Sequence, residues 1–277
     1  MTTRRFKAPL RAVLSVMGLA CACVSHASQT QENVPETSRS LWGDKTTVAV
    51  GLGTIVSPRY MGSQQTHALL LPTLSLSRGI FFADSTRGVG AEYMNDSGFY
   101  ISSALAYDPG RKDHDSSWRA GSDRLRGMGD VTGATTADLL LSQAITPWLA
   151  VSGEAEFRVA GYQRGNRYRF GLESTLFNSS TDTVTLGVNA HMGDGRYNRT
   201  YFGVSEQQER TSRFERFDAK SGIYAYSTSL DWQHSFNAHW TLLMGANLMA
   251  FSDRARHSPI VESGTGAAGF AMLDYTF

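Results

Sequence analysis

The chain has 277 residues, with 26 Lys and Arg side chains against 25 Asp and Glu. Four of the basic residues and none of the acidic ones lie within the first 27 positions, so the rest of the chain is mildly acidic. Phosphate binding requires a basic face, and this charge balance therefore excludes nucleic acid from the expected partners.

The N-terminal segment has the organisation of a secretory signal peptide. Residues 1–11 are basic, residues 12–24 form a charge-free apolar run, and Ser25-His26-Ala27 offers a small–x–small cleavage site. The run is shorter than the roughly 18–20 residues that a membrane-spanning helix needs. We predict a signal peptide over 1–27, whose cleavage removes both cysteines and all thiol chemistry. Residues 28–43 are polar and predict a flexible periplasmic lead-in.

From residue 44 to residue 277, apolar residues recur at every second position over consecutive segments, which is the spacing of β-strands. Short turn-like connections alternate with longer polar ones. The region 79–95 could also be read as one irregular strand instead of two. The twelve expected strands are 45–57, 66–77, 79–84, 87–95, 98–107, 134–146, 148–161, 166–178, 182–193, 222–236, 239–252 and 266–277.

A soluble sandwich and a membrane barrel would both alternate in this way. The strands are about ten residues or longer, as a tilted membrane span requires. Aromatic residues lie near the strand ends, where interfacial girdles form. An all-β, antiparallel transmembrane barrel of about 12 strands is therefore expected, because a closed barrel pairs every backbone polar group. Long external loops and short periplasmic turns then give both termini a periplasmic location.

The last segment, residues 266–277, is expected to close this barrel. Leu273, Tyr275 and Phe277, together with Ala271, would face lipid. The intervening Met272, Asp274 and Thr276 would face the lumen.

Charged residues on the inward face predict a network in the lumen. Its members lie on two adjacent predicted strands and are Glu154, Glu156, Arg158, Arg169 and Glu173. Such a network could plug a narrow barrel or form a selective wall for small polar solutes. The plug is favoured, because a barrel of about twelve strands has a modest bore and because Tyr100, Phe177 and Phe251 are also expected to point inward.

No catalytic, cofactor-binding or metal-binding residues are predicted. His191 is expected in the lumen beside Asn189 as a polar wall residue, and Pro259 more plausibly fixes a turn than Ser258 attacks a substrate. His114 with Asp108, Asp113 and Asp115 could bind a divalent cation, but the spacing matches no calcium-loop motif. A solvated loop is the simpler interpretation.

Several segments resemble, in order, those of the MipA/OmpV family of Gram-negative outer-membrane proteins. They are "GLGTIVSPRYMGS" (51–63), "LLPTLSLSRGIFFA" (70–83), "RGVGAEY" (87–93), "RTYFGVSEQQ" (199–208) and "HSPIVESG" (257–264), with the terminal aromatic strand. The charged segment 108–130 is longer than the family pattern. The resemblance implies an integral barrel of the cell outer membrane. It also implies a scaffold for peptidoglycan-synthesising and peptidoglycan-cleaving enzymes, or a porin-like or adhesive protein.

The sequence and the resemblance together predict a non-enzymatic scaffold, with a channel or transporter for small polar solutes as the alternative. The expected partners are outer-membrane lipid and lipopolysaccharide, the barrel insertion machinery and murein hydrolases or synthases. No cofactor is expected.

Overall fold

The computed structural model describes residues 41–161 and 164–277, and these form a closed antiparallel β-barrel. The predicted signal peptide and most of the predicted lead-in lie outside the described residues. Leu41, Trp42 and Gly43 do belong to them and lie against the turn between the second and third strands, where Ile80 N–H donates to Leu41 C=O at 3.1 Å. Within the described residues, no helix is long and apolar enough to cross a membrane.

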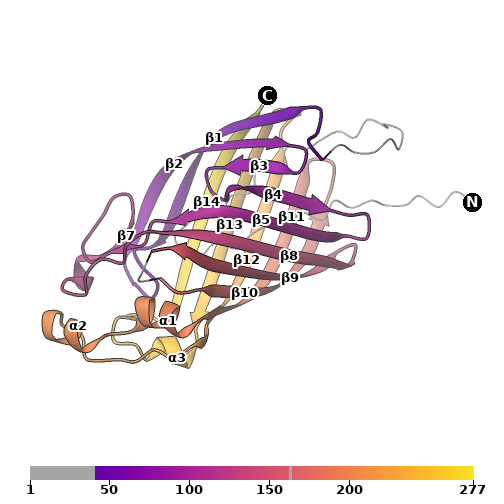
Figure 1. Ribbon diagram of the computed structural model, residues 1–277. Coiled ribbons are helices and arrows are strands. Elements are labelled where there is room, and N and C mark those ends of the chain that lie inside the picture. The colour runs from indigo at the N-terminus through magenta and orange to yellow at the C-terminus, as the bar shows by residue number, and fades with distance from the viewer. Residues whose placement is uncertain (1–40, 162–163) are drawn as a thin grey trace, which may run out of the picture.

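Twelve strands make the wall, in the order β1-β14-β13-β12-β11-β10-β9-β8-β5-β4-β3-β2 (Figure 1). Their bounds are β1 Thr46–Pro58, β2 Thr66–Arg78, β3 Phe81–Asp84, β4 Gly88–Met94, β5 Phe99–Asp108, β8 Ala134–Thr146, β9 Leu149–Ala160, β10 Arg167–Asn178, β11 Asp182–Gly193, β12 Gly222–Ser235, β13 Trp240–Phe251 and β14 Thr265–Thr276. The predicted barrel and its strand number are confirmed, and the uncertain region 79–95 is two short strands.

The terminal strand closes the barrel as predicted, because β14 pairs with β13 on one side and with β1 on the other. Leu273 on its outer face is 40% exposed, whereas Met272 and Asp274 are buried on the inner face. Asp274 accepts a hydrogen bond of 2.9 Å from the Thr73 hydroxyl of β2. This bond passes over Gly51 of β1, which lies between the two strands.

One prediction about the wall is wrong. Phe177 was expected to point inward, but its side chain is 54% exposed and pairs across the sheet with Val184 on the outer side. The register shifts between Thr175 and Phe177, so Leu176 is an extra residue in β10. A bulge of this kind reverses the alternation of side chains beyond it.

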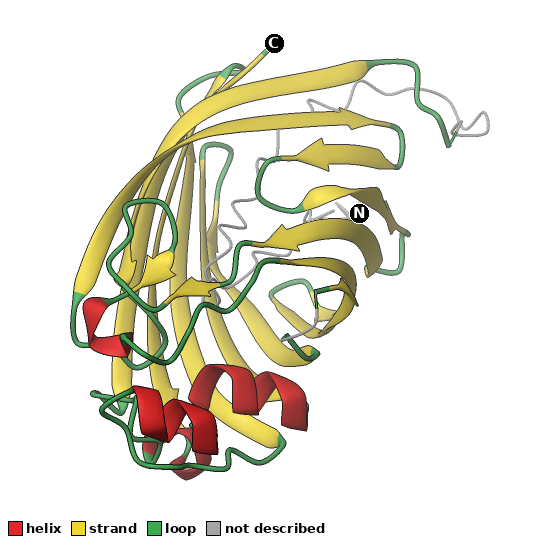
Figure 2. Cartoon of the chain, turned by 60° about the vertical axis from the view of Figure 1, so that its left-hand side comes forward, coloured by secondary structure: helices red, strands yellow, loops and turns green. Residues whose placement is uncertain are grey.

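The wall has uneven height. β3 and β4 are four and seven residues long, whereas β2 and β5 beside them have 13 and ten. Asp84 makes the hairpin turn back early, since its carboxylate accepts hydrogen bonds from Thr86 N–H at 2.7 Å and Arg87 N–H at 3.1 Å. Figure 2 shows these short strands beside the two long strands that run over the top of the view.

Structured segments gather at the end of the barrel that carries the long connections (Figures 1 and 2). They are the two-residue strands β6 (Arg111–Lys112) and β7 (Ala120–Gly121), the 3-10 helix η1 (Asp123–Leu125), and the helices α1 (Gly195–Phe202), α2 (Glu206–Thr211) and α3 (Asp253–Arg256). The sequence predicted only polar loops here. Each α-helix begins after a polar residue, and Asp194 and Ser205 accept hydrogen bonds from the first turns of α1 and α2.

These loops pack into a lid with its own apolar interior. One cluster joins α1 to the ends of β12 and β13 on the lid side. Its members include Tyr197, Tyr201, Phe202, Tyr224, Met249, Phe251 and Ala255. A second cluster joins four different connections and consists of Tyr60, Leu125, Met128, Val204, Phe214 and Ile260. The burial of these apolar side chains therefore helps to hold the loops together.

Candidate functional site: the barrel lumen and its lid

Carboxylates and guanidinium groups pair across β9 and β10 inside the barrel. Glu154 lies directly opposite Arg169, and the Arg169 Nε donates to Glu154 Oε2 at 2.9 Å. Arg169 also donates to Asn189 Oδ1 of β11 at 3.0 Å. Three neighbouring strands are therefore joined on their inner faces.

A second group surrounds Glu156, which is 5% exposed. Arg167 of β10 lies opposite it and donates to it at 2.9 Å, and Arg164 forms an ion pair with it from the connection between β9 and β10. Arg164 also pairs with Asp108, whose carboxylate accepts a hydrogen bond of 3.0 Å from the Tyr201 hydroxyl of α1. The charged wall of the lumen thus continues into the lid.

The structure brings only part of the predicted network together through these contacts. Glu154 and Arg169 bond to one another, whereas Glu156 bonds to Arg164 and Arg167. Arg158 instead donates to the backbone carbonyl of Gly161 at 2.7 Å. Glu173 lies further along the same face of β10, opposite Ala150.

Aromatic stacking fixes the lid on the barrel. The Tyr197 ring stacks on that of Tyr224, an inner-face residue of β12, with centroids 5.6 Å apart, and lies 4.7 Å from that of Tyr201. Burial and the nearby Asp108 carboxylate raise the pKa of Tyr201 well above its ordinary value. Tyr201 therefore stays a neutral donor to Asp108 over the whole physiological range.

A cavity lies between this lid and the lumen wall. Its volume is about 1080 Å³ when the solvent at its mouth is included. Apolar residues of β5 line it together with charged groups, among them Ala104, Ala106, Asp108, Arg111, Glu156 and Arg167. A mixed lining of this kind suits a ligand with one polar and one apolar part.

Neither His191 nor His257 forms a triad in the described part of the chain. His191 lies on the inner face of β11, and its Nε2 is 2.8 Å from the Ser227 hydroxyl of β12. Nucleophilic activation would also need an acid on Nδ1, and no such contact of His191 is found among residues 41–161 and 164–277. His257 Nδ1 contacts the Asp253 carbonyl at 2.8 Å, and the Ser258 hydroxyl donates to the Phe202 carbonyl at 2.5 Å. These contacts are structural.

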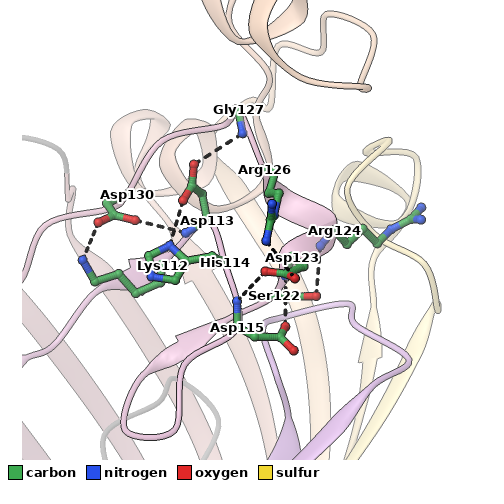
Figure 3. A network of polar contacts seen from close by, with 10 residues as sticks. All are labelled: Lys112, Asp113, His114, Asp115, Ser122, Asp123, Arg124, Arg126, Gly127 and Asp130. Atoms are coloured by element: carbon green, nitrogen blue, oxygen red, sulfur yellow. Dashed lines mark hydrogen bonds and ion pairs between the residues drawn. The ribbon is translucent and has the colours of Figure 1, made fainter.

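The acidic loop around β6 folds through its own carboxylates (Figure 3). Asp115 and Asp123 each accept a hydrogen bond from the other's N–H, at 3.0 and 3.1 Å. Asp113 accepts from Gly127 N–H at 3.3 Å, and Asp130 pairs with the Lys112 ammonium. Asp113, His114 and Asp130 have ligand atoms within 4.8 Å of one another, but a lysine already neutralises Asp130.

Comparison with protein families gives one match, which covers the barrel from residue 50 of β1 onward. Residues 50–277 match the family described as MltA-interacting protein MipA. The chain belongs to the MipA family. Among curated individual proteins, no match was found for this MipA-family chain.

Solved structures similar to this MipA-family barrel are distant. The COG4313 outer membrane channel from Pseudomonas putida F1 is 12% identical with a TM-score of 0.49, over 89% of this chain and all of that one. OprB from Pseudomonas putida is 7% identical with a TM-score of 0.43, over 84% of this chain and 94% of that one. The CymD monoaromatic hydrocarbon channel is 12% identical with a TM-score of 0.44, over 84% and 88%. The fold assignment rests on the strand pairing described above.

Sequence reasoning missed two partners of Glu156. Arg167 precedes Arg169 by two positions on the same face of β10, so alternation alone could have found it. Arg164 lies in an irregular connection, and no periodic signal predicts the direction of its side chain. Its burial between Asp108 and Glu156 depends on the lid, which is built from distant segments.

Proposed function

We propose that this MipA-family protein is an integral barrel of the Gram-negative outer membrane that acts as a non-enzymatic scaffold for murein hydrolases or synthases. The lid is the observation that carries the proposal. Two apolar clusters pack at the end with the long connections, and ion pairs line the lumen wall beneath them. A barrel of this kind suits a structural role better than the role of a pore through which solutes diffuse freely. The family description, MltA-interacting protein, also favours an interaction role.

Site-specific photo-crosslinking in intact cell envelopes tests the scaffold. A crosslinker at Asp96 or Ser180, two exposed positions in the short turns, should capture a murein hydrolase or synthase. The matched control is Gln207 on α2, at the opposite end of the barrel, which should capture none. The scaffold proposal would be contradicted if a cell-wall enzyme were captured from Gln207 alone, or if none were captured from either turn.

A conduit for small polar solutes is the second candidate, and the charged cavity behind the lid favours it. Planar-bilayer recordings separate the two functions. A scaffold with this lid should give no reproducible ion steps, whereas a conduit should give steps that change when Arg167 or Glu154 is replaced.

A further inference from the structure

The hairpin β3–β4 is short, so the strands on either side of it, β2 and β5, have no partner on the hairpin side over the parts nearest the lid. On β2, pairing with the hairpin side ends at Leu74, whose carbonyl accepts from Ser85 N–H at 2.9 Å. Thr66–Thr73 pair only with β1. On β5, pairing with β4 ends at Leu105. We call the opening between residues 66–73 of β2 and 105–108 of β5 the side window.

The side window is framed on its other two sides. The turn Ser85–Gly88 forms its lower edge, which is the edge farther from the lid, and this turn is fixed by Asp84. The β6–β7 segment lies along its upper edge, where Gly121 N–H donates to Arg59 C=O at 2.8 Å and the Ser122 hydroxyl donates to Gln65 Oε1 at 3.0 Å. The unpaired part of β2 is eight residues long, or about 26 Å at the usual rise per residue.

The backbone and the side chains of β2 match an open edge. Because Leu74 bonds toward the hairpin, the backbone groups of Pro72, Leu70 and Ala68 point the same way, and among the described residues they have no backbone partner there. Pro72 has no N–H to leave unpaired, which is why proline is tolerated on strand edges. In hydrocarbon such an edge is costly, so it must border a hydrated cavity or bind a ligand.

The central part of the side window's rim is apolar on both faces. Leu70 faces outward and is 58% exposed, while Leu69 and Leu71 face the lumen. On the other edge, Leu105 faces outward and Ala106 faces inward. Inward leucines contrast with the polar inner face of β11, which carries Thr185 and Asn189. An apolar chain could therefore lie across this rim from the bilayer into the barrel.

The cavity borders the side window on three sides, at the β5 edge and at the lower and upper edges. Its lining includes Thr86 and Arg87 from the lower edge, Ala106 and Tyr107 from β5, and Arg111 and Ala120 from the upper edge. The lid packs at the end of the barrel above it, so the window would give the cavity a lateral route to the membrane.

One buried cation in this cavity lacks a counter-ion. Four arginines line it, and three are paired: Arg87 with Glu92 at 2.7 Å, Arg164 with Asp108, and Arg167 with Glu156 at 2.6 Å. Arg111 is 3% exposed, and among the described residues it has no carboxylate within 4.0 Å. Its Nε has no hydrogen bond, and its Nη1 reaches the Tyr201 carbonyl at 3.4 Å.

An uncompensated buried guanidinium is unfavourable by itself and becomes favourable when an anion binds it. Burial lowers the pKa of Arg111, and the Coulombic influence of Tyr201, Tyr60, Asp113 and Asp130 only partly offsets this. A carboxylate or phosphate in the cavity would supply the missing charge and two acceptor oxygens.

We propose that the side window binds an anionic amphiphile from the membrane, with its carboxylate or phosphate head on Arg111 and its apolar chain across the rim formed by Leu69–Pro72 and Leu105. The ligand is either a free fatty acid or an anionic membrane lipid. This inference goes beyond the scaffold and rests on the membrane placement proposed above.

Photolabelling of the full-length protein in phosphatidylcholine nanodiscs tests this site. The probes are a long-chain fatty acid, a long-chain alcohol and a phosphatidylglycerol, each with a diazirine on the chain. The fatty acid, the phosphatidylglycerol or both should label Leu69–Pro72 or Leu105–Tyr107, and the alcohol should not. Labelling by one anionic probe alone identifies the source of the ligand. Equal labelling by the alcohol, or no window labelling by either anionic probe, would overturn the proposal.

Variants separate the head site from the chain site. Arg111→Gln should reduce window labelling about tenfold or more, because it removes a charge-assisted contact. Arg119→Gln removes a charge from an exposed position in the same loop and should label as the wild type. Ala106→Trp should block the chain while keeping Arg111. Wild-type labelling of Arg111→Gln would overturn the head site. If that variant does not fold, the labelling of the wild-type protein by the fatty acid and by the alcohol still tests the head site. Failure to enter nanodiscs would instead contradict the membrane placement.

Discussion

Glu154 and Arg169 show how a charged pair inside the barrel differs from one on its surface. Their side chains are 15% and 11% exposed, so replacing one partner leaves a mostly buried charge without compensation. We expect Glu154→Gln to lower the free energy of unfolding by about 3 kcal/mol. The double variant with Arg169→Gln should lose less than the sum of the two single variants. Urea unfolding in detergent micelles, followed by circular dichroism, measures all three.

The Glu206–Arg210 pair on α2 is the matched control. Its nitrogen–oxygen distance is 2.7 Å, but its side chains are 63% and 73% exposed. Glu206→Gln should therefore change the free energy of unfolding by less than about 0.5 kcal/mol. A Glu154→Gln effect equally small would mean that water enters the lumen and screens the inner pair.

Asp130 makes the order of the acidic loop depend on pH. Burial disfavours its charged form, but the hydrogen bonds from the Lys112 ammonium and Asp113 N–H outweigh this and lower its pKa below 3.8. A lowered folded-state pKa stabilises the loop above the unfolded value, and the stabilisation is lost as pH falls through the folded value. The protection of residues 111–131 against hydrogen exchange, corrected for the intrinsic exchange rate at each pH, should therefore fall below about pH 4.

Asp130→Asn is the corresponding variant. It should exchange quickly in this loop at neutral pH and lose most of the acid-dependent step. An unchanged step in Asp130→Asn would assign the pH dependence to another carboxylate of the loop.

The charge network also shows what sequence can predict at the level of single residues. Alternation placed Glu154 and Arg169 on one face, and the order of adjacent hairpins placed them side by side, so their contact followed from local rules. Phe177 did not follow, because the extra residue Leu176 reverses the alternation and nothing in the local pattern marks it.

At the level of elements, the seam between β1 and β14 depends on two glycines with different surroundings. A Cβ on Gly51 would lie 1.8 Å from Asp274 Oδ1 and 2.6 Å from the Thr73 hydroxyl, so Gly51→Ala breaks the bond that joins β2 to β14. A cost of about 1–3 kcal/mol is expected. Hydrogen exchange of the β1 and β14 amides reports the loosened seam.

Gly53→Ala is the control in the same strand. Its Cβ would first meet the terminal methyl group of Met272 at 3.0 Å, which can move aside. This variant should stay within about 0.5 kcal/mol of the wild type. Equal losses of unfolding free energy in both variants would show that the seam tolerates no side chain at either position. The contact with Asp274 would then not be the cause of the Gly51→Ala effect.

Elements were predictable in the wall and not in the lid, for a physical reason. A strand between water and an apolar medium shows its environment in every second residue, and all twelve ranges followed from that pattern. The helices α1 and α2 have eight and six residues, too few for a clear helical period. The apolar residues of α1 bury against loops far away in the chain, such as those of Met61 and Val131. Local sequence does not record such contacts.

For the whole molecule, the decisive question is what medium surrounds the apolar outer face. Leu172 on β10 is 51% exposed and lies between Val151 and Val188 on the neighbouring strands. In a bilayer, Leu172→Lys should lower the free energy of unfolding by about 2–4 kcal/mol. Gln207→Lys on the exposed side of α2 should have almost no effect. Unfolding from lipid vesicles measures both, and a Leu172→Lys effect below about 0.5 kcal/mol would mean that water covers this face.

The lid also decides where a foreign peptide can be displayed on this protein. Tips of surface loops usually accept inserted tags because little of the fold depends on them. Here Tyr197–Phe202 and Ser258–Ile260 belong to the packed interior at that end, so a tag inserted there would displace core residues. The stretch Ser116–Arg119, with Trp118 at 74% exposure, is the better position. An antibody raised against the folded end would, for the same reason, recognise several chain segments together and fail on the denatured polypeptide.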